Sequence, residues 1–178
     1  MITGILVALP EELHTLTPAT LAQGECLSVA ENTLVILSGA GIENAEHAAQ
    51  VLINKGAKQL ISWGCAGALS PNLKAGDLVI PTAIIAHNNI QLTPHSLWAK
   101  QIISTLEPLI KCYNGKLFES SSIISLAKDK TEQYQETQAL AVDMESGAVA
   151  RLALKANLPF VAIRSIIDPA NLDLPQAI

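Results

Sequence analysis

Two carboxylates, Asp143 and Glu145, stand among alanine, valine and methionine in the stretch AVDMESGAVA (141–150). An ionised carboxylate in an apolar element needs a cationic or hydrogen-bonding partner, because its uncompensated burial is strongly unfavourable. If a helix begins near Glu145, this residue heads the buried stripe, where a carboxylate accepts backbone N–H groups and favours the helix dipole. Two interpretations stay open for Glu145, a first-turn capping acid or a ligand-binding acid. Asp143 is interpreted as the cap itself.

A second polar pair interrupts the apolar segment FVAIRSIID (160–168). Arg164 and Asp168 have the same parity, so on a strand both side chains point to one face. An arginine within an apolar strand requires an acid or an anionic ligand. Two interpretations therefore stay open for Arg164, a structural salt bridge or a ligand-binding role. Asp168, just before Pro169, could also be a simple turn aspartate.

Glycines follow two further apolar runs, in SGAGIENA (38–45) and WGCAGAL (63–69). Glycine permits positive φ and close backbone approach, so N–H groups at such turns can hold an anion or a substrate hydroxyl. The first stretch lacks the third glycine of G-x-G-x-x-G, and no acid follows at 57–60. Dinucleotide binding is therefore not predicted.

Metal-binding and covalent-nucleophile patterns are weak. Cys65 stands at the centre of WGCAG, but the second glycine of a nucleophile elbow is out of register, so a covalent mechanism is a minor alternative. The cysteines show no C-x-x-C spacing and are expected to be free thiols in a reducing compartment: Cys26, Cys65 and Cys112. The histidines have no metal-ligand spacing, so we expect no metal site and no cofactor: His14, His47, His87 and His95.

Composition limits the class of protein. A chain of 178 residues suits a single domain, and 49% hydrophobic with 15% charged residues indicates a buried-sheet architecture. The net charge of −5 and the lack of a Lys/Arg cluster disfavour nucleic acid as a partner. No apolar run approaches the ~20 residues that span a bilayer. The first residues, MITGILVALPEEL, lack the basic region of a signal peptide, so we expect a cytoplasmic protein without an integral membrane segment.

The elements that must position these residues are short apolar runs alternating with segments of helical period. Several runs are apolar on both faces, which is typical of strands covered by helices on both sides. The pattern predicts an α/β fold with a largely parallel sheet. Helices are expected over 44–57, 94–109 and 145–159, and strands over 4–9, 34–39, 59–67, 77–86, 116–127, 139–144 and 160–168.

In such a sheet the ligand site lies beyond the carboxyl ends of the strands. The residues that directly follow the apolar runs are acids and glycines, and we expect them to meet at a common rim. They fall at 10–12, 39–41, 64–67, 143–145 and 168–169.

Together these motifs resemble the superfamily of purine nucleoside phosphorylases and 5′-methylthioadenosine/S-adenosylhomocysteine nucleosidases. The most specific part is VDMES followed by R-x-x-x-D, and within the superfamily the hopanoid-associated phosphorylases, which cleave adenine from adenosylhopane, are the most similar. The resemblance implies one nucleoside phosphorylase-like domain over 1–178, a three-layer αβα fold with a central mixed, largely parallel sheet. Its motifs, in order, are ALPEEL, SGAGIENA, WGCAGAL, AGDLVIP, AVDMESGAVA and RSIIDPA.

The resemblance also implies an enzyme, an N-ribosyl hydrolase or phosphorylase that cleaves the N-glycosidic bond of an adenine nucleoside-like substrate, adenosylhopane being one candidate. Breaking this bond builds positive charge on the ribose and negative charge on the purine, so it needs an acid at the base and carboxylates near the sugar. By resemblance, Asp168 protonates purine N7 and Glu12 orients or deprotonates the nucleophilic water. Arg164 pairs with these acids.

The substrate-binding residues follow from the same resemblance. Glu145 binds the ribose hydroxyls, and Met144 packs against the sugar. The remaining contacts are made by backbone groups, those of Cys65, Ala66 and Gly67 with substrate or nucleophile and those of Ser122 and Ile123 with the base.

Some positions depart from the family pattern. Relatives often have serine where Cys65 stands, and serine or threonine where Ile167 stands, hydroxyls that could bind phosphate or steady the acid. Only two arginines, Arg151 and Arg164, occur in the chain, so no arginine-rich phosphate pocket is visible. Water is therefore favoured as the nucleophile, with phosphate open as a co-substrate. The alternative is a catalytically silent nucleoside-binding or partner-binding relative.

The chain ends at Ile178, where relatives continue into a further helix. We expect either a truncated chain or a site completed by a neighbouring subunit, in a homo-oligomer. The resemblance is weak over 87–97 and at the chain end, where we expect the pocket for the group on the ribose 5′ carbon.

Overall fold

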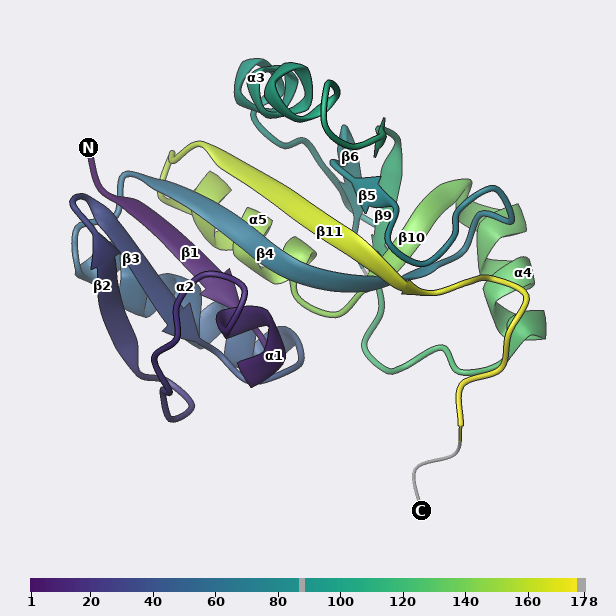
Figure 1. The fold of residues 1–178 in the computed structure, drawn as a ribbon, viewed down its shortest axis with the longest axis horizontal. Helices are drawn as coiled ribbons and strands as arrows, with labels where there is room; N and C mark the ends of the chain where they lie inside the picture. The colour runs from purple at the N-terminus through teal and green to yellow at the C-terminus, as the bar shows by residue number, and fades with distance from the viewer. Residues whose placement is uncertain (87–88, 176–178) are drawn as a thin grey trace.

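Eleven strands form one mixed sheet in the part of the chain that the structure describes (Figure 1). The structure is a computed structural model that describes residues 1–86 and 89–175. The strands are β1 (Thr3–Val7), β2 (Cys26–Ala30), β3 (Thr33–Leu37), β4 (Gln59–Ala68), β5 (Leu78–Val79), β6 (Ala83–Ile85), β7 (Gln91–Leu92), β8 (Cys112–Tyr113), β9 (Lys116–Glu119), β10 (Ala139–Asp143) and β11 (Phe160–Asp168).

The long strand β4 organises the sheet. It pairs in parallel with β1 and with β11, and its last residues pair antiparallel with β10. Strand β1 also pairs in parallel with β3, and β9 pairs in parallel with β10 and β6. The other antiparallel pairs are β2–β3, β6–β7 and β5–β11. The carboxyl ends of β1, β4 and β11 therefore lie at one end of the sheet, as expected for an α/β fold.

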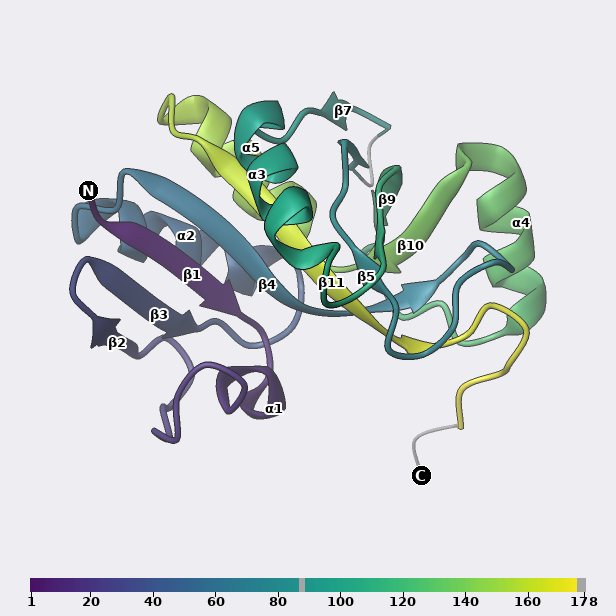
Figure 2. The ribbon, with the colours of Figure 1, turned by 45° about the horizontal axis from the view of Figure 1, so that its top comes forward.

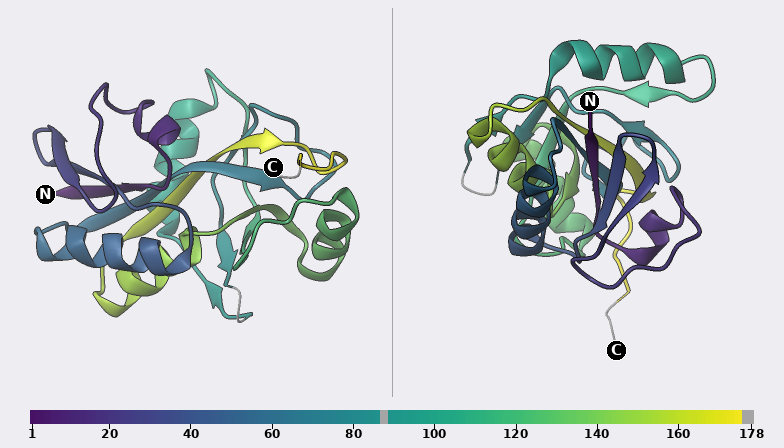
Figure 3. Two further views of the ribbon diagram at one scale, coloured as in Figure 1. Left: turned by 90° about the horizontal axis from the view of Figure 1, so that it is seen from below. Right: turned by 90° about the vertical axis from the view of Figure 1, so that its left-hand side faces the viewer.

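Helices cover both faces of this sheet (Figures 2 and 3). Helices α2 (Ile42–Asn54) and α5 (Ser146–Lys155) pack side by side on one face, and α3 (Ser96–Leu106) packs on the other. Two further helices lie near the strand ends, α1 (Pro10–Leu13) after β1 and α4 (Ala127–Thr137) before β10. The α/β class with a central mixed sheet is confirmed.

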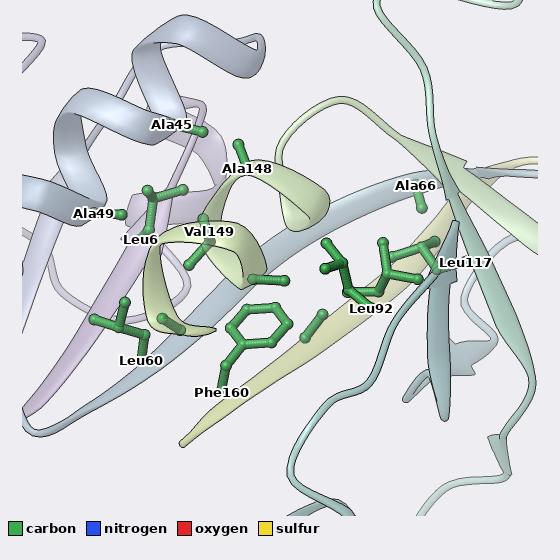
Figure 4. Packing of buried hydrophobic residues seen from close by; sticks show 14 of the residues in the cluster. Leu6, Ala45, Ala49, Leu60, Ala66, Leu92, Leu117, Ala148, Val149 and Phe160 are labelled. Carbon is green, nitrogen blue, oxygen red and sulfur yellow. The ribbon is translucent and has the colours of Figure 1, made fainter. Parts of the chain in front are cut away.

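The main core lies between the sheet and the helix pair α2 and α5 (Figure 4). Small residues let the two helices approach each other and the strands closely, because an alanine adds little width to a packed layer. Ala45 and Ala49 on α2 face Ala148 and Val149 on α5, and Phe160 packs below them; all are buried. The packed core fixes the start of α5, where the opening motif lies.

Some elements differ from those expected. The run 77–86 forms two short strands, β5 and β6, since Pro81 lies between them and proline interrupts a ladder of hydrogen bonds. The run 116–127 leaves the sheet after Glu119, and α4 begins at Ala127. Helix α4 was not predicted because its sequence, AKDKTEQYQET, has no clear apolar stripe. None of the described helices has the length and apolar character needed to cross a bilayer.

Candidate active site

A cavity of about 280 Å³ opens where β1, β4, β10 and β11 end. Its position agrees with the rim expected from the strand ends, and each acid proposed from the sequence except Glu11 borders it. The lining residues are Ala8, Leu9, Glu12, Ala40, Cys65, Ala66, Gly67, Ser122, Ile123, Ile124, Val142, Asp143, Met144, Glu145, Ile167, Asp168 and Leu174.

Glu12 is fixed by backbone N–H groups from two elements. Its Oε2 accepts hydrogen bonds from the N–H of Ala8 (2.8 Å) and Leu9 (3.1 Å), and its Oε1 accepts one from Cys65 N–H (2.7 Å). Gly64 leaves room for the carboxylate, since a Cβ at that position would lie 2.6 Å from the Glu12 carboxyl carbon. The Cys65 amide therefore binds Glu12, which corrects the expectation that it faces substrate or nucleophile.

Glu145 is held at the junction of β10 and α5. Its Oε1 accepts a hydrogen bond from Gly41 N–H (2.8 Å), and its Oε2 accepts a long one from Met144 N–H (3.3 Å). Gly41 has φ +99°, a backbone conformation that residues other than glycine rarely adopt. The glycine turn that was expected to hold an anion therefore holds this carboxylate. Burial, and next the charge of Asp143, raise the pKa of Glu145 to about 7. Glu145 is the residue before the first turn of α5.

Asp143 and Arg164 form a buried ion pair beneath the cavity. Arg164 Nη2 lies 2.7 Å from Asp143 Oδ2, and Nε donates to the same oxygen at 2.8 Å. The same oxygen accepts the N–H and hydroxyl of Ser146, and Nη2 also donates to Ser62 Oγ. Asp143 thus accepts the first N–H of α5, as a cap would. Arg164 was expected to pair with Asp168 and Glu12, but its ion pair is with Asp143, and it does not line the cavity.

Asp168 lies at the end of β11, beyond an irregularity in the pairing with β4 between Ile166 and Asp168. The extra residue breaks the two-residue alternation, so the argument that placed Arg164 and Asp168 on one face does not extend to Asp168. Asp168 lines the cavity and packs against Gly67, where a Cβ would lie 3.1 Å from Oδ1. Its Oδ2 accepts a hydrogen bond of 2.6 Å from Lys130 Nζ.

Lys130 and Ser62 were not identified from the sequence. Lys130 and Lys128 look alike in the polar segment AKDKTEQYQET, yet Lys130 is fully buried and Lys128 is exposed. The one available signal is the spacing of Lys130 and Tyr134, which lie four residues apart and so share a face of α4. Ser62 lies within the apolar run of β4, where a small hydroxyl gives no distinct pattern.

The remaining expected residues border the cavity. Met144, Ala66, Gly67, Ser122 and Ile123 line it. Of the segment 87–97, residues 87 and 88 lie outside the described part, as does the chain end at 176–178, and none of residues 89–97 lines the cavity.

The environment of Cys65 does not favour a covalent mechanism. Burial, and next the Glu12 carboxylate, raise the pKa of its thiol above the ordinary value. The thiolate needed for nucleophilic attack is therefore disfavoured. All three cysteines are free thiols, as expected.

The sequence matches a family model over residues 3–177, that of the phosphorylase superfamily. Among curated proteins, it is 28% identical to the 5′-methylthioadenosine/S-adenosylhomocysteine nucleosidase of Staphylococcus haemolyticus, an alignment covering 94% of this chain and 86% of the relative. It is also 28% identical to the protein of that name from Shewanella frigidimarina, covering 98% of this chain and 84% of the relative.

Solved structures show the same fold. A Helicobacter pylori nucleosidase variant with 5′-methylthioadenosine in its active site aligns with a TM-score of 0.83 at 22% identity, covering 96% of this chain and 86% of the other. The futalosine hydrolase of the same organism aligns with a TM-score of 0.79 at 23% identity, covering 95% and 85%.

Proposed function

This chain belongs to the phosphorylase superfamily, and on that premise we propose that it hydrolyses the N-glycosidic bond of an adenine nucleoside. The observation that supports the proposal best is the meeting of Glu12, Glu145 and Asp168 around one cavity. The curated relatives that align along most of the chain bear the name of nucleosidases, which supports the same reaction class.

In the proposed reaction, each carboxylate has a separate task. Asp168 gives a proton to N7 of the adenine while the bond between C1′ and N9 breaks, so the base leaves neutral. Glu145 accepts hydrogen bonds from the ribose hydroxyls and stabilises the positive charge that develops on the ring. Glu12 orients a water molecule and takes its proton as the oxygen bonds to C1′, giving adenine and a free ribose derivative.

Water suits this cavity better than phosphate. Four carboxylates border the cavity, those of Glu12, Asp143, Glu145 and Asp168, and no lysine or arginine is among its described lining residues. Arg164 is paired with Asp143, and Lys130 with Asp168. A phosphate dianion would meet several negative charges without a free cation, whereas water needs only the Glu12 carboxylate.

The substrate within this class is proposed from the neighbouring surface. A second, mostly apolar cavity of about 360 Å³ shares Leu9, Glu12, Cys65 and Ile167 with the first. It offers space for an apolar group on the ribose 5′ carbon. The names of the relatives make 5′-methylthioadenosine the first candidate, and adenosylhopane stays a finer proposal that rests on the sequence resemblance alone.

The test is adenine release from 5′-methylthioadenosine, S-adenosylhomocysteine, adenosine and adenosylhopane, each with and without phosphate. We expect release without phosphate and a free reducing sugar as the second product. Strict phosphate dependence with a sugar phosphate as product would replace hydrolysis by phosphorolysis. Binding of the nucleosides without any release would leave a silent binding protein as the better description.

The assembly and location of the protein are separate proposals. We expect a homo-oligomer in the cytoplasm. Light scattering at several protein concentrations tests the first, and cell fractionation tests the second.

A further inference from the structure

Lys130, like Arg164, is a buried cation that no step of the proposed reaction uses, and of the two it is the one paired with Asp168. Its side chain is 0% exposed, although a lysine is almost never fully buried without a partner. It lies on α4, a helix whose other charged residues are exposed to solvent. Lys128, for example, has an 81% exposed side chain.

All three hydrogens of the Lys130 ammonium have an acceptor on one short segment of chain. Nζ donates to Asp168 Oδ2 at 2.6 Å, to the carbonyl oxygen of Leu172 at 2.9 Å and to that of Pro169 at 3.3 Å. An ammonium group offers three donors, so its bonding is complete. The arrangement fixes one oxygen of the Asp168 carboxyl group relative to the backbone that follows β11.

The two oxygens of Asp168 are thereby made unequal. Oδ2 accepts the hydrogen bond from Lys130, which it can do whether the carboxyl group is ionised or protonated. Within the described part of the chain, Oδ1 accepts no hydrogen bond, and it lies beside Gly67 at the cavity. Oδ1 is therefore the oxygen available to carry a proton to a bound base.

We propose that Lys130 is a positioning residue that holds the Asp168 carboxyl group with Oδ1 directed at the leaving base and stabilises the carboxylate left after proton transfer. This inference rests on the proposed function, because it assigns Lys130 a task in the same reaction. Lys130 does not touch the substrate in this account and acts through Asp168.

The hydrogen bonds of Lys130 differ from those that hold the outer wall of the cavity, which we define as residues 122–124 and Leu174. That wall is held by other bonds, since Leu174 N–H donates to the Ser125 carbonyl and Ala127 N–H donates to Asp173 Oδ1 at 2.7 Å. Loss of the ammonium group is therefore expected to change the chemical step and to leave substrate binding largely unaffected.

The experiment compares adenine release by wild type, Lys130→Met, Lys130→Gln and Lys130→Arg, with Lys128→Met as the matched control on the same helix. We expect Lys130→Met and Lys130→Gln to lower kcat about 10- to 100-fold, the loss typical of a reacting group misplaced by ~1 Å. KM stays within about threefold of wild type, and Lys128→Met leaves both constants unchanged.

A double-mutant cycle distinguishes positioning from a general structural role. If Lys130 acts through Asp168, adding Lys130→Met to Asp168→Asn lowers the residual activity by less than about threefold. A further loss as large as in the wild-type background would assign Lys130 to the fold in general and overturn the proposal. So would a folded Lys130→Met or Lys130→Gln variant with wild-type kcat, or one in which only KM changes.

The arginine variant decides the question if both neutral variants fail to fold, as thermal unfolding would reveal. A planar guanidinium group cannot occupy the place of the compact ammonium with the same three acceptors, so we expect a folded protein with kcat lowered at least about tenfold. A folded arginine variant with wild-type kcat would contradict the proposal. Absence of adenine release by the wild type would instead refute the proposed function, so the two failures are distinct.

Discussion

At the scale of single residues, Glu145 is the acid whose charge depends most directly on its surroundings. It is buried at 7% exposure, and burial together with the nearby Asp143 raises its pKa to about 7. The ribose hydroxyls need the ionised form as acceptor, so Glu145 binds them best above that pH. The hydrogen bond from Gly41 keeps the carboxylate in place in its ionised form.

The first prediction concerns the pH dependence of catalysis. As the pH falls through about 7, kcat/KM should fall toward a slope of tenfold per pH unit, because Glu145 becomes protonated. Glu145→Gln should lack this limb and lower kcat/KM roughly 10- to 100-fold at high pH, the value of a hydrogen bond to a charged group. A pH–rate profile of both proteins is the measurement, with Glu31→Gln, an exposed glutamate between β2 and β3, as control. An unchanged limb in Glu145→Gln would contradict the assignment.

The same raised pKa has a consequence for stability. The folded protein holds a proton on Glu145 between the ordinary pKa of 4.5 and about 7, whereas the unfolded chain has lost it. The free energy of unfolding therefore falls as the pH rises through this window, and the charge is destabilising above it. Glu145→Gln should raise the free energy of unfolding at alkaline pH by on the order of 1–3 kcal/mol relative to wild type. Denaturant titrations of both proteins at the two ends of this pH window measure the change in the free energy of unfolding. An equal change at both ends would contradict the prediction.

At the scale of elements, the contact between β4 and the turn after β1 positions Glu12. A Cβ at residue 64 would overlap the Glu12 carboxyl group, whose three backbone hydrogen bonds come from both elements. The flexible end of the glutamate would move in response, away from the cavity.

The second prediction follows from this contact. Gly64→Ala should lower kcat about as much as Glu12→Gln does, by roughly 10²- to 10⁴-fold for a lost general base. Combined with Glu12→Ala, it should cause little additional loss, because the same group is affected. Steady-state kinetics of the single and double variants measure it. Wild-type activity of Gly64→Ala would show that the Glu12 position is not needed.

The third prediction concerns the outer wall of the cavity. Asp173 accepts the Ala127 N–H at the start of α4, so it caps this helix from a distant part of the chain. Asp173→Ala should cost about 0.5–2 kcal/mol of stability, as the loss of a helix cap does. It should also raise KM about three- to tenfold with little change in kcat, since Leu174 lines the cavity.

Asp129→Ala is the matched control for this prediction, because Asp129 carries the same charge in the first turn of α4. It should leave KM unchanged. Equal effects of the two substitutions would mean that the charge at the helix start matters and the bond to residue 173 does not.

The elements that the sequence predicted are those with strong apolar patterns. Burial on one or both faces gives a regular pattern of apolar residues in the sequence. The elements that lie within or next to the expected segments for this reason are β1, β3, β4, β10, β11, α2, α3 and α5. The placement of acids after these strands then followed from the rule for parallel sheets.

The missed features depend on information that no local pattern contains. Helix α4 is polar and is held by its contacts with β10 and with the segment after β11. The irregularity at the end of β11 follows from the pairing with β4, and the partner of Asp168 lies 38 positions away in the sequence. A salt bridge from Arg164 to a buried acid, in contrast, was one of two alternatives that the apolar strand suggested, although the sequence did not identify Asp143 as that acid.

At the scale of the whole molecule, the fold gathers four acids from three distant parts of the chain at one end of the sheet. Cations accompany two of them, Arg164 below Asp143 and Lys130 beside Asp168, both largely buried. The cavity thus presents carboxylates, and the whole chain carries a net charge of −5. Both features favour a neutral nucleoside over a dianion as ligand.

The fourth prediction tests the central claim most directly, that Asp168 protonates the leaving adenine in a hydrolysis. The measurement is the rate of adenine release from 5′-methylthioadenosine in phosphate-free buffer, for wild type and Asp168→Asn. We predict turnover by the wild type and a kcat lower by roughly 10²- to 10⁴-fold in the variant, the usual contribution of a general acid, with KM little changed. Equal rates of adenine release by the two proteins would contradict the account.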